Sequence, residues 1–359
     1  LIHSPLSNYW LLYTRLLQFL TPLFLFSFLS IFVDSDEKGK LTHWIFGSLL
    51  IAGIVEAFIG LVQYSHQAPL GLRLLSEPKV FQSCFLSPPD GTKWIFDTPF
   101  FHSQHLIFRV TGTLPHANVL GGFLATSLLI SSFFFTYFSR WRLFVSLAIP
   151  LQFFTLLLTY SRSALFGWIL ATAFWFAYLL FHKLQTKKKV LLTLIALLFT
   201  SATLSTAILY KQLLYRGGIL NYENSPAFGA DQDRLKYQQK AFEQIKESPF
   251  LGSGFGQLSF REKNPSSVHN IYLYLAAEMG LPALVAFLIF LGTLLYSAIQ
   301  APPTPHLQTL LALFFLFLFI GCCDFYPILF QQGKLLFFLS AALLGLHSLK
   351  KSKGFATCT

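Results

Sequence analysis

The chain has 359 residues, of which 54% are hydrophobic and 11% are charged, with a formal net charge of +11. Because soluble domains average about 25% charged residues, this composition excludes an ordinary soluble protein. The Lys and Arg residues gather in short segments between apolar blocks, without a nucleic-acid-binding motif, so we expect no nucleic-acid partner.

The apolar blocks are about 20 residues long, which is the length of a membrane-crossing helix. Strict alternation of apolar and polar residues is absent, which disfavours an outer-membrane barrel. The sequence therefore predicts an all-α polytopic protein embedded in a lipid bilayer. We expect spans at approximately residues 10–33, 42–63, 117–138, 143–160, 163–181, 190–209, 270–298, 307–326 and 333–349.

These spans form three groups, within residues 1–63, 117–209 and 270–349. The chain starts at Leu1 rather than Met, and we expect further helices ahead of it.

The short loops between spans sort by charge. The basic ones fall on one side, which the positive-inside rule makes the cytoplasm: Ser139–Arg142, residues 182–189 and the tail 350–359. The opposite, extracytoplasmic face then carries the loop 64–116, the turn Ser161–Ser163 and a long polar segment at 210–269.

The polar segment contains an amphipathic run at 231–247, which predicts a helix with Arg234 in its first turn. Its apolar face, expected to rest on the membrane surface or the top of the bundle, consists of Leu235, Gln238, Phe242 and Ile245. The glycines of Gly252–Gly256 lack the Gly-Lys-Ser/Thr ending of a phosphate-binding loop, so they predict a flexible turn.

Two arginines and a histidine on this face are the main candidates for chemistry. Arg162 lies in a tight turn between two spans, and with Arg234 it can form a clamp for a diphosphate, since guanidinium groups bind phosphate in a bidentate way. His269 immediately precedes a span, and imidazole exchanges protons near neutral pH. Asn270 can orient His269 or cap the helix. The alternatives are a snorkelling interfacial arginine for Arg162, a solvated surface arginine for Arg234 and an interfacial histidine at a helix start for His269.

Arg109–Gly122 is a second polar entry into a span on the same face. Arg109, His116 and Asn118 either line the same cavity or serve as caps and loop packing. Functional hypotheses extend to acids in or beside spans, namely Glu56, Glu278 and Asp324. The four Cys residues show no metal-ligand spacing, and we expect no metal.

Three blocks together resemble the O-antigen ligase and polymerase superfamily of bacterial membrane glycosyltransferases. The blocks are Arg109–Gly122, Tyr160–Ala164, and Asp233–Gly256 followed by His269 and Asn270. They extend over about residues 105–285, and their order is more specific than any one of them.

The resemblance implies a GT-C-like helical bundle in the bacterial inner membrane, with its active site on the extracytoplasmic face. It implies a donor glycan on undecaprenyl diphosphate and no metal, nucleotide sugar or other cofactor. The acceptor would be lipid A–core, another glycan or a protein. It assigns Arg162 and Arg234 to the diphosphate and makes His269 the catalytic residue, with the cavity completed by Arg109, His116, Asn118 and Asn270.

We therefore expect glycan transfer to an acceptor hydroxyl, of the ligase type and with inversion at the anomeric carbon. A polymerase that extends lipid-linked repeats is the alternative within the family. A transporter for an anionic solute, with Arg162, Arg234 and Glu56 along its pathway, is the alternative from another class. A non-catalytic membrane assembly partner is a third, but it leaves the two arginines and the histidine without a role.

Overall fold

The computed structural model describes residues 39–75, 77–78, 85–86, 107–216, 226–254 and 268–355, and six isolated positions between 17 and 27. Apart from turns, these ranges are helical, with one antiparallel pair of two-residue strands, β1 Phe85–Leu86 and β2 Ile107–Phe108. Almost all of the predicted span at 10–33 and much of the loop 64–116 lie outside the described residues.

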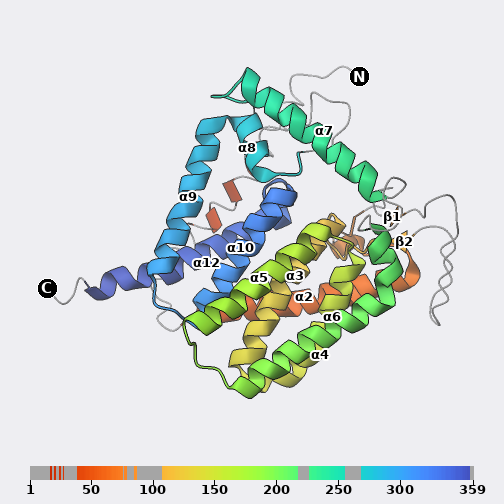
Figure 1. Ribbon diagram of the computed structural model, residues 1–359, viewed down its shortest axis with the longest axis vertical. Coiled ribbons are helices and arrows are strands. Elements are labelled where there is room, and N and C mark those ends of the chain that lie inside the picture. Colours follow the sequence, from red (N-terminus) through yellow and green to blue (C-terminus); the bar gives the residue numbers. More distant parts are fainter. Residues whose placement is uncertain are drawn as a thin grey trace.

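Seven helical segments among the described residues are long and apolar enough to cross a membrane. They are α2 Lys40–His66, α3 Ala117–Tyr137, Ser139–Leu158 (η4 Ser139–Trp141 with α4 Arg142–Leu158), α5 Arg162–Phe181, Lys188–Leu214 of α6 Lys188–Arg216, α9 Leu281–Gln300 and α10 Pro305–Cys323. The last long helix, α12 Gln331–Phe355, packs on α10 and α9 and runs into the predicted tail (Figure 1). The prediction of an all-α polytopic membrane protein is confirmed.

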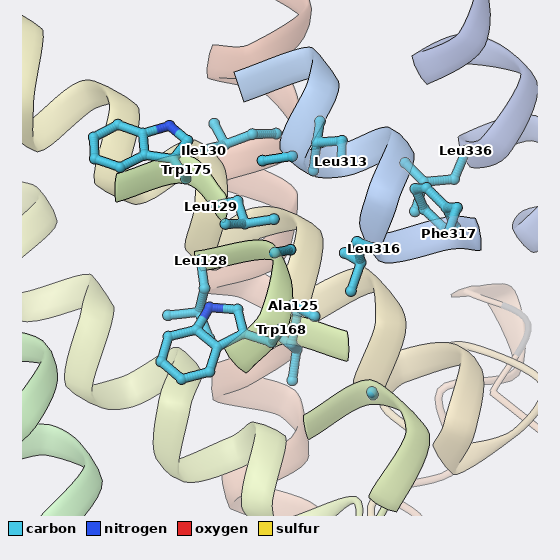
Figure 2. Close-up of a cluster of buried hydrophobic side chains, with 14 of the residues drawn as sticks. Ala125, Leu128, Leu129, Ile130, Trp168, Trp175, Leu313, Leu316, Phe317 and Leu336 are labelled. Carbon is cyan, nitrogen blue, oxygen red and sulfur yellow. The ribbon is translucent and has the colours of Figure 1, made fainter. Parts of the chain in front are cut away.

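Helix α3 lies at the centre of the bundle. Of its apolar stretch 94% is buried, against 17% for α9. A helix that is apolar all round belongs inside a bundle, whereas one with a single buried stripe belongs at its rim. Figure 2 shows the packing of α3 against α5 and α10, through Leu128, Leu129, Ile130, Trp168, Trp175, Leu313 and Phe317. Because α3 packs against both α5 and α10, the ends of these three helices lie close together.

One end of the bundle is covered by helix α7 Pro226–Glu247 and the short helix α8 Ile271–Met279 (Figure 1). We call it the α7 end. The basic turn Ser139–Trp141 belongs to the opposite end, where Gly39 at the start of α2 approaches His306 and His347. The predicted separation of basic loops from the polar segment therefore agrees with the arrangement of the helices.

The predicted continuous span at 270–298 is wrong, because the chain breaks at Gly280 into α8 and α9. Gly280 has a φ of 84° and a ψ of 167°, a backbone conformation that residues with a side chain rarely adopt, and it ends α8. The backbone of the glycine-rich turn supplies donors to α8, with Ser253 N–H to Ala277 O at 2.9 Å and Gly254 N–H to Glu278 O at 3.0 Å. Residues 252–254 are therefore packed against α8 rather than forming the flexible turn that the sequence predicts, and residues 255–256 lie outside the described residues.

Of the two alternatives for the predicted apolar face of α7, packing on the top of the bundle does not hold for Leu235 and Phe242, and contact with the membrane surface stays a prediction. Leu235 and Phe242 are about half exposed, at 54% and 52%. The residues that face the bundle are Tyr237 and Ala241, with Ile245 partly buried one turn later. Ala241 packs in a small cluster with Val268, Tyr274 and Ala277. A small side chain at this position lets α7 approach α8 closely, which a larger residue of the predicted face would prevent.

Candidate functional site

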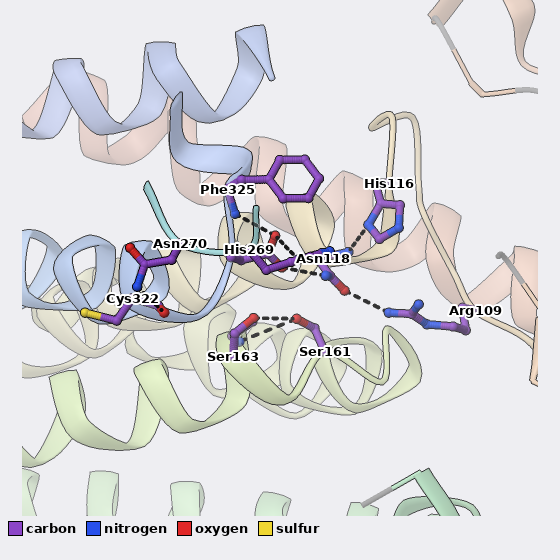
Figure 3. A network of polar contacts seen from close by, with 11 residues as sticks. Arg109, His116, Asn118, Ser161, Ser163, His269, Asn270, Cys322 and Phe325 are labelled. Atoms are coloured by element: carbon purple, nitrogen blue, oxygen red, sulfur yellow. Dashed lines mark hydrogen bonds and ion pairs between the residues drawn. The ribbon is translucent and has the colours of Figure 1, made fainter. Parts of the chain in front are cut away.

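A chain of four polar side chains crosses the α7 end of the bundle (Figure 3). Arg109 donates to Thr159 O at 3.1 Å and to Asn118 Oδ1 at 2.8 Å. Asn118 Nδ2 donates to Asp324 Oδ2 at 2.6 Å, and Asp324 Oδ1 lies 3.4 Å from His269 Nδ1. We call Arg109, Asn118, Asp324 and His269 the relay. It joins the start of α3, the end of α10 and the start of α8.

Only His269 in the relay is accessible, with 24% of its side chain exposed, whereas Asp324 is 2% exposed. Burial raises the pKa of Asp324, but His269, Arg234 and a hydrogen bond from the Phe325 N–H outweigh it and hold the pKa below its ordinary value. Asp324 is therefore a carboxylate at neutral pH. It faces Nδ1 of an imidazole whose ring also stacks edge-on against Phe325, with ring centroids 4.6 Å apart.

The turn that carries Arg162 lies beside the start of α3. Ser161 caps α5 by accepting from Ala164 N–H at 3.4 Å, and the preceding Tyr160 has a φ of 50°. Gly121 of α3 makes the close approach possible, since a Cβ there would lie 2.9 Å from Ala164 Cβ and 3.0 Å from Ser161 Cβ. The Arg162 turn is thus packed one helical turn away from Asn118.

Arg162 holds Asp231 of α7 in a bidentate ion pair. Its Nη1 and Nη2 lie 3.2 and 2.5 Å from the two carboxylate oxygens. The two side chains are 27% and 30% exposed, so the pair sits at the surface of the site. Arg234, one turn further along α7, is partly buried and acts electrostatically on Asp324 and Cys323. Helix α7 therefore brings Asp231 to Arg162 and Arg234 to the neighbourhood of Asp324.

The fold brings Arg162, Arg234 and His269 to the same end of the bundle, from helix α5, helix α7 and the residue pair before α8. Residues 147–288, which contain all three, match the family model described as O-antigen ligase. This region belongs to the O-antigen ligase superfamily. No curated protein matches the chain. The family implies a glycosyltransferase-like enzyme that works in a membrane on lipid-linked glycan and acceptor substrates.

Two of the predicted site residues, His116 and Asn270, cap helices. His116 is the N-cap of α3, accepting from Asn118 N–H at 3.1 Å. Asn270 is the N-cap of α8, accepting from Tyr272 and Leu273 N–H, and it donates to Cys322 O at 3.2 Å. These contacts follow the capping alternative for both residues. Asn270 also locks the start of α8 onto the end of α10, which positions His269.

Glu56 accepts hydrogen bonds from the N–H and the hydroxyl of Thr113, in the segment before α3. Glu278 is fully buried in α8. Among the residues that the structure describes, no group of three or more His, Cys, Asp or Glu side chains is placed to hold a metal ion.

Sequence reasoning missed two partners of the candidate site residues. It noted Asp324 as an acid beside a span, but not its contact with His269, which lies 55 positions earlier in the chain. It placed Asp231 as the first residue of the amphipathic run, whereas the Asp231 carboxylate binds Arg162. Buried acids at span ends are a usable signal for function, but only the fold supplies their partners.

Proposed function

We propose that this protein is an O-antigen ligase-type glycosyltransferase of the bacterial inner membrane, acting on the extracytoplasmic face. It transfers a glycan from undecaprenyl diphosphate to an acceptor hydroxyl. The observation that carries the proposal is the relay: its accessible end is His269, and the buried Asp324 carboxylate lies directly behind that imidazole. Arg162 and Arg234 lie at the same end of the bundle. An ionised carboxylate behind an exposed imidazole is the arrangement of a general base.

In this mechanism Asp324 orients His269. With its proton on Nδ1, 3.4 Å from Asp324 Oδ1, His269 keeps the lone pair of Nε2 free to accept a proton. The acceptor oxygen attacks the anomeric carbon while its proton passes to Nε2. Asp324 stabilises the imidazolium that forms, and Asn118 and Arg109 hold Asp324 in place from behind.

The bond between the anomeric carbon and the diphosphate breaks in the same step, and its electron pair leaves with the diphosphate. Arg162 and Arg234 stabilise this growing negative charge, the electrostatic contribution that is often the largest in catalysis. Helix α5 is 20 residues long and begins at Arg162. Its N-terminus therefore adds a partial positive charge beside that side chain. Direct displacement inverts the anomeric configuration, and the step needs no metal or nucleotide.

The test is reconstitution of the purified protein in proteoliposomes with undecaprenyl-diphosphate-linked glycan and an acceptor. His269→Ala is expected to lower kcat by about 10²–10⁴-fold, the usual contribution of a general base. Arg162→Ala and Arg234→Ala are expected to lower kcat/KM about tenfold or more, because each removes charge-assisted contacts to the leaving group. His66→Ala and Lys236→Ala, at exposed positions of α2 and α7, are the matched controls.

Full transfer by both His269→Ala and Arg162→Ala would show that the chemistry lies elsewhere. Three acceptors separate the family alternatives: lipid A–core for the ligase that we propose, a second lipid-linked repeat for a polymerase, and a protein. NMR of the new linkage checks inversion. Uptake of an anionic solute without any lipid-linked donor would instead favour the transporter.

A further inference from the structure

An apolar pocket of about 530 Å³ lies between helices α5, α9 and α10, away from the α7 end of the bundle (Figure 1). It is formed by the last turns of α5, the last turns of α9 and the first half of α10. Apart from Tyr178 and His182, the side chains that line it are hydrocarbon. Helix α9 packs mainly on α8 and α12, so a space remains between α9 and the packed pair α5 and α10.

The depth of the pocket corresponds to one leaflet of a bilayer. Phe315, the lining residue furthest along α10, comes ten positions after Pro305 at the start of that helix, which is about 15 Å at 1.5 Å per residue. The hydrocarbon core of a bilayer is about 30 Å thick. The pocket therefore extends from the end opposite α7 to about the middle of the membrane, as an acyl chain of a lipid in that leaflet does.

The mouth of the pocket carries basic side chains. His182 is the C-cap of α5, and its ring contacts those of Tyr178 and Phe181, with centroids 4.2 and 5.0 Å apart. The next residue, Lys183, is exposed and has a φ of 48°, and the same loop continues to three further lysines at 187–189. The stacked rings hold the imidazole at the boundary between the apolar pocket and the basic loop.

No acidic residue of the neighbouring sequence compensates this charge. Asp and Glu are absent from the sequence at 138–216 and at 279–323, two stretches that contain all three helices of the pocket and the basic loop. Lysines beside a membrane surface attract the phosphates of anionic lipids. An apolar pocket one leaflet deep, with uncompensated positive charge at its mouth, is complementary to a lipid with an acyl chain and an anionic head group.

We propose that the pocket binds one acyl chain of an anionic phospholipid, with the phosphate of that lipid against His182 and Lys183. The positive-inside rule makes its leaflet the cytoplasmic one. The lipid fills the space beside α9 and braces this helix against α5 and α10. This site is independent of the proposed glycosyltransferase function, because Arg162 and His269 lie at the other end of the bundle.

The test titrates the detergent-purified full chain with palmitoyl-oleoyl phosphatidylglycerol or the matching phosphatidylcholine, and native mass spectrometry measures the affinity for the first bound lipid. The wild type is expected to prefer phosphatidylglycerol. Ala177 is an exposed residue of the lining, and Ala177→Trp is expected to weaken binding of both lipids about tenfold or more, because the indole takes the place of several methylene groups. Ala173→Trp, one turn earlier at an exposed position outside the lining, is the matched control and is expected to bind as the wild type does.

A second pair of variants tests the head group. Lys183→Gln is expected to reduce the preference for phosphatidylglycerol about fivefold, the effect of one lysine near an anionic membrane surface. Lys236→Gln, at an exposed position of α7 at the other end of the bundle, is expected to leave the preference unchanged.

The proposal is overturned if the wild type shows no preference, if Ala177→Trp binds normally, or if Ala173→Trp loses as much affinity. A dimer that Ala177→Trp dissociates would show that a second copy of the chain fills the pocket instead. Displacement of phosphatidylglycerol by equimolar undecaprenyl phosphate would assign the pocket to the carrier lipid, which also contradicts the proposal. Should Ala177→Trp purify poorly, Ala177→Leu and Ala173→Leu give the same comparison with a smaller side chain.

Discussion

The two sides of the site are held in different ways. On one side His269 ends a relay whose other members, Asp324, Asn118 and Arg109, are all buried. On the other side Arg162 pairs with Asp231 at the surface. Buried polar contacts in a low dielectric are strong and specify one geometry, whereas exposed ion pairs contribute little and exchange readily. The proposed base, His269, is thus held in one position, whereas Arg162, which we propose to bind phosphate, has an exchangeable partner in Asp231.

The supporting helices explain this difference. The relay is built from the ends of α3 and α10, which pack against each other in the bundle core. Asp231 and Arg234 sit on α7, which lies across the end of the bundle and touches it through a small cluster around Ala241 (Figure 1). Elements with few buried contacts open at low free-energy cost. The relay is therefore expected to be rigid, and α7 is expected to move more easily.

The largest effect is expected from Asp324→Asn, which tests whether the relay is needed for catalysis. The amide is similar in size but lacks the charge that orients His269 and stabilises its protonated form, and we expect kcat to fall about 10²-fold or more. The measurement is the transfer assay in proteoliposomes. Asp233→Asn removes a carboxylate from α7 and serves as the control, with transfer expected to remain at the wild-type rate. Near-normal transfer by Asp324→Asn would remove the relay from the mechanism.

A substitution at Gly280 tests the support of α8. Its φ of 84° and the backbone of Phe250 beside it leave no room for a Cβ, so Gly280→Ala is expected to destabilise the fold by about 1–3 kcal/mol. Gly292 of α9 is the matched control, because a Cβ there meets nothing within 4 Å. We expect Gly292→Ala to be neutral or stabilising by up to about 1 kcal/mol.

Thermal unfolding in detergent measures both glycine variants. Equal transition temperatures for Gly280→Ala and Gly292→Ala would mean that the turn at 249–254 moves aside without loss of stability. Helix α8 would then be held no more firmly than α7.

The smallest expected effect is the dependence of stability on acid pH. Since the pKa of Asp324 is below its ordinary value of 3.8, its carboxylate stabilises the folded protein fully above that value. The contribution is lost as the pH falls through the lower, folded-state pKa. Thermal unfolding below about pH 4 should therefore show a steeper loss for the wild type than for Asp324→Asn. Parallel curves would mean that His269 and Arg234 do not stabilise the charged carboxylate.

Much of the fold followed from sequence because a bilayer accepts few structures. Apolar blocks of the right length predict spans, and the turn at Ser161–Ser163 was correctly placed between α4 and α5. The break at Gly280 was missed because Leu281 and the residues after it continue the apolar run without a polar interruption. The sequence left two orientations of α7 open, because Leu235 and Phe242 suit a membrane surface as well as a core, and the structure shows that both are half exposed.

The sequence by itself determined the class of the protein and the superfamily of its central region, and it predicted Arg162, Arg234 and His269 as site residues. These depend on local composition, length and order along the chain. Only the tertiary structure decided that Asp324 backs His269 and that Asp231 occupies Arg162, because these contacts join helices distant in sequence. Their geometry depends on close approaches, such as that of α3 to the Arg162 turn at Gly121, which packing alone determines.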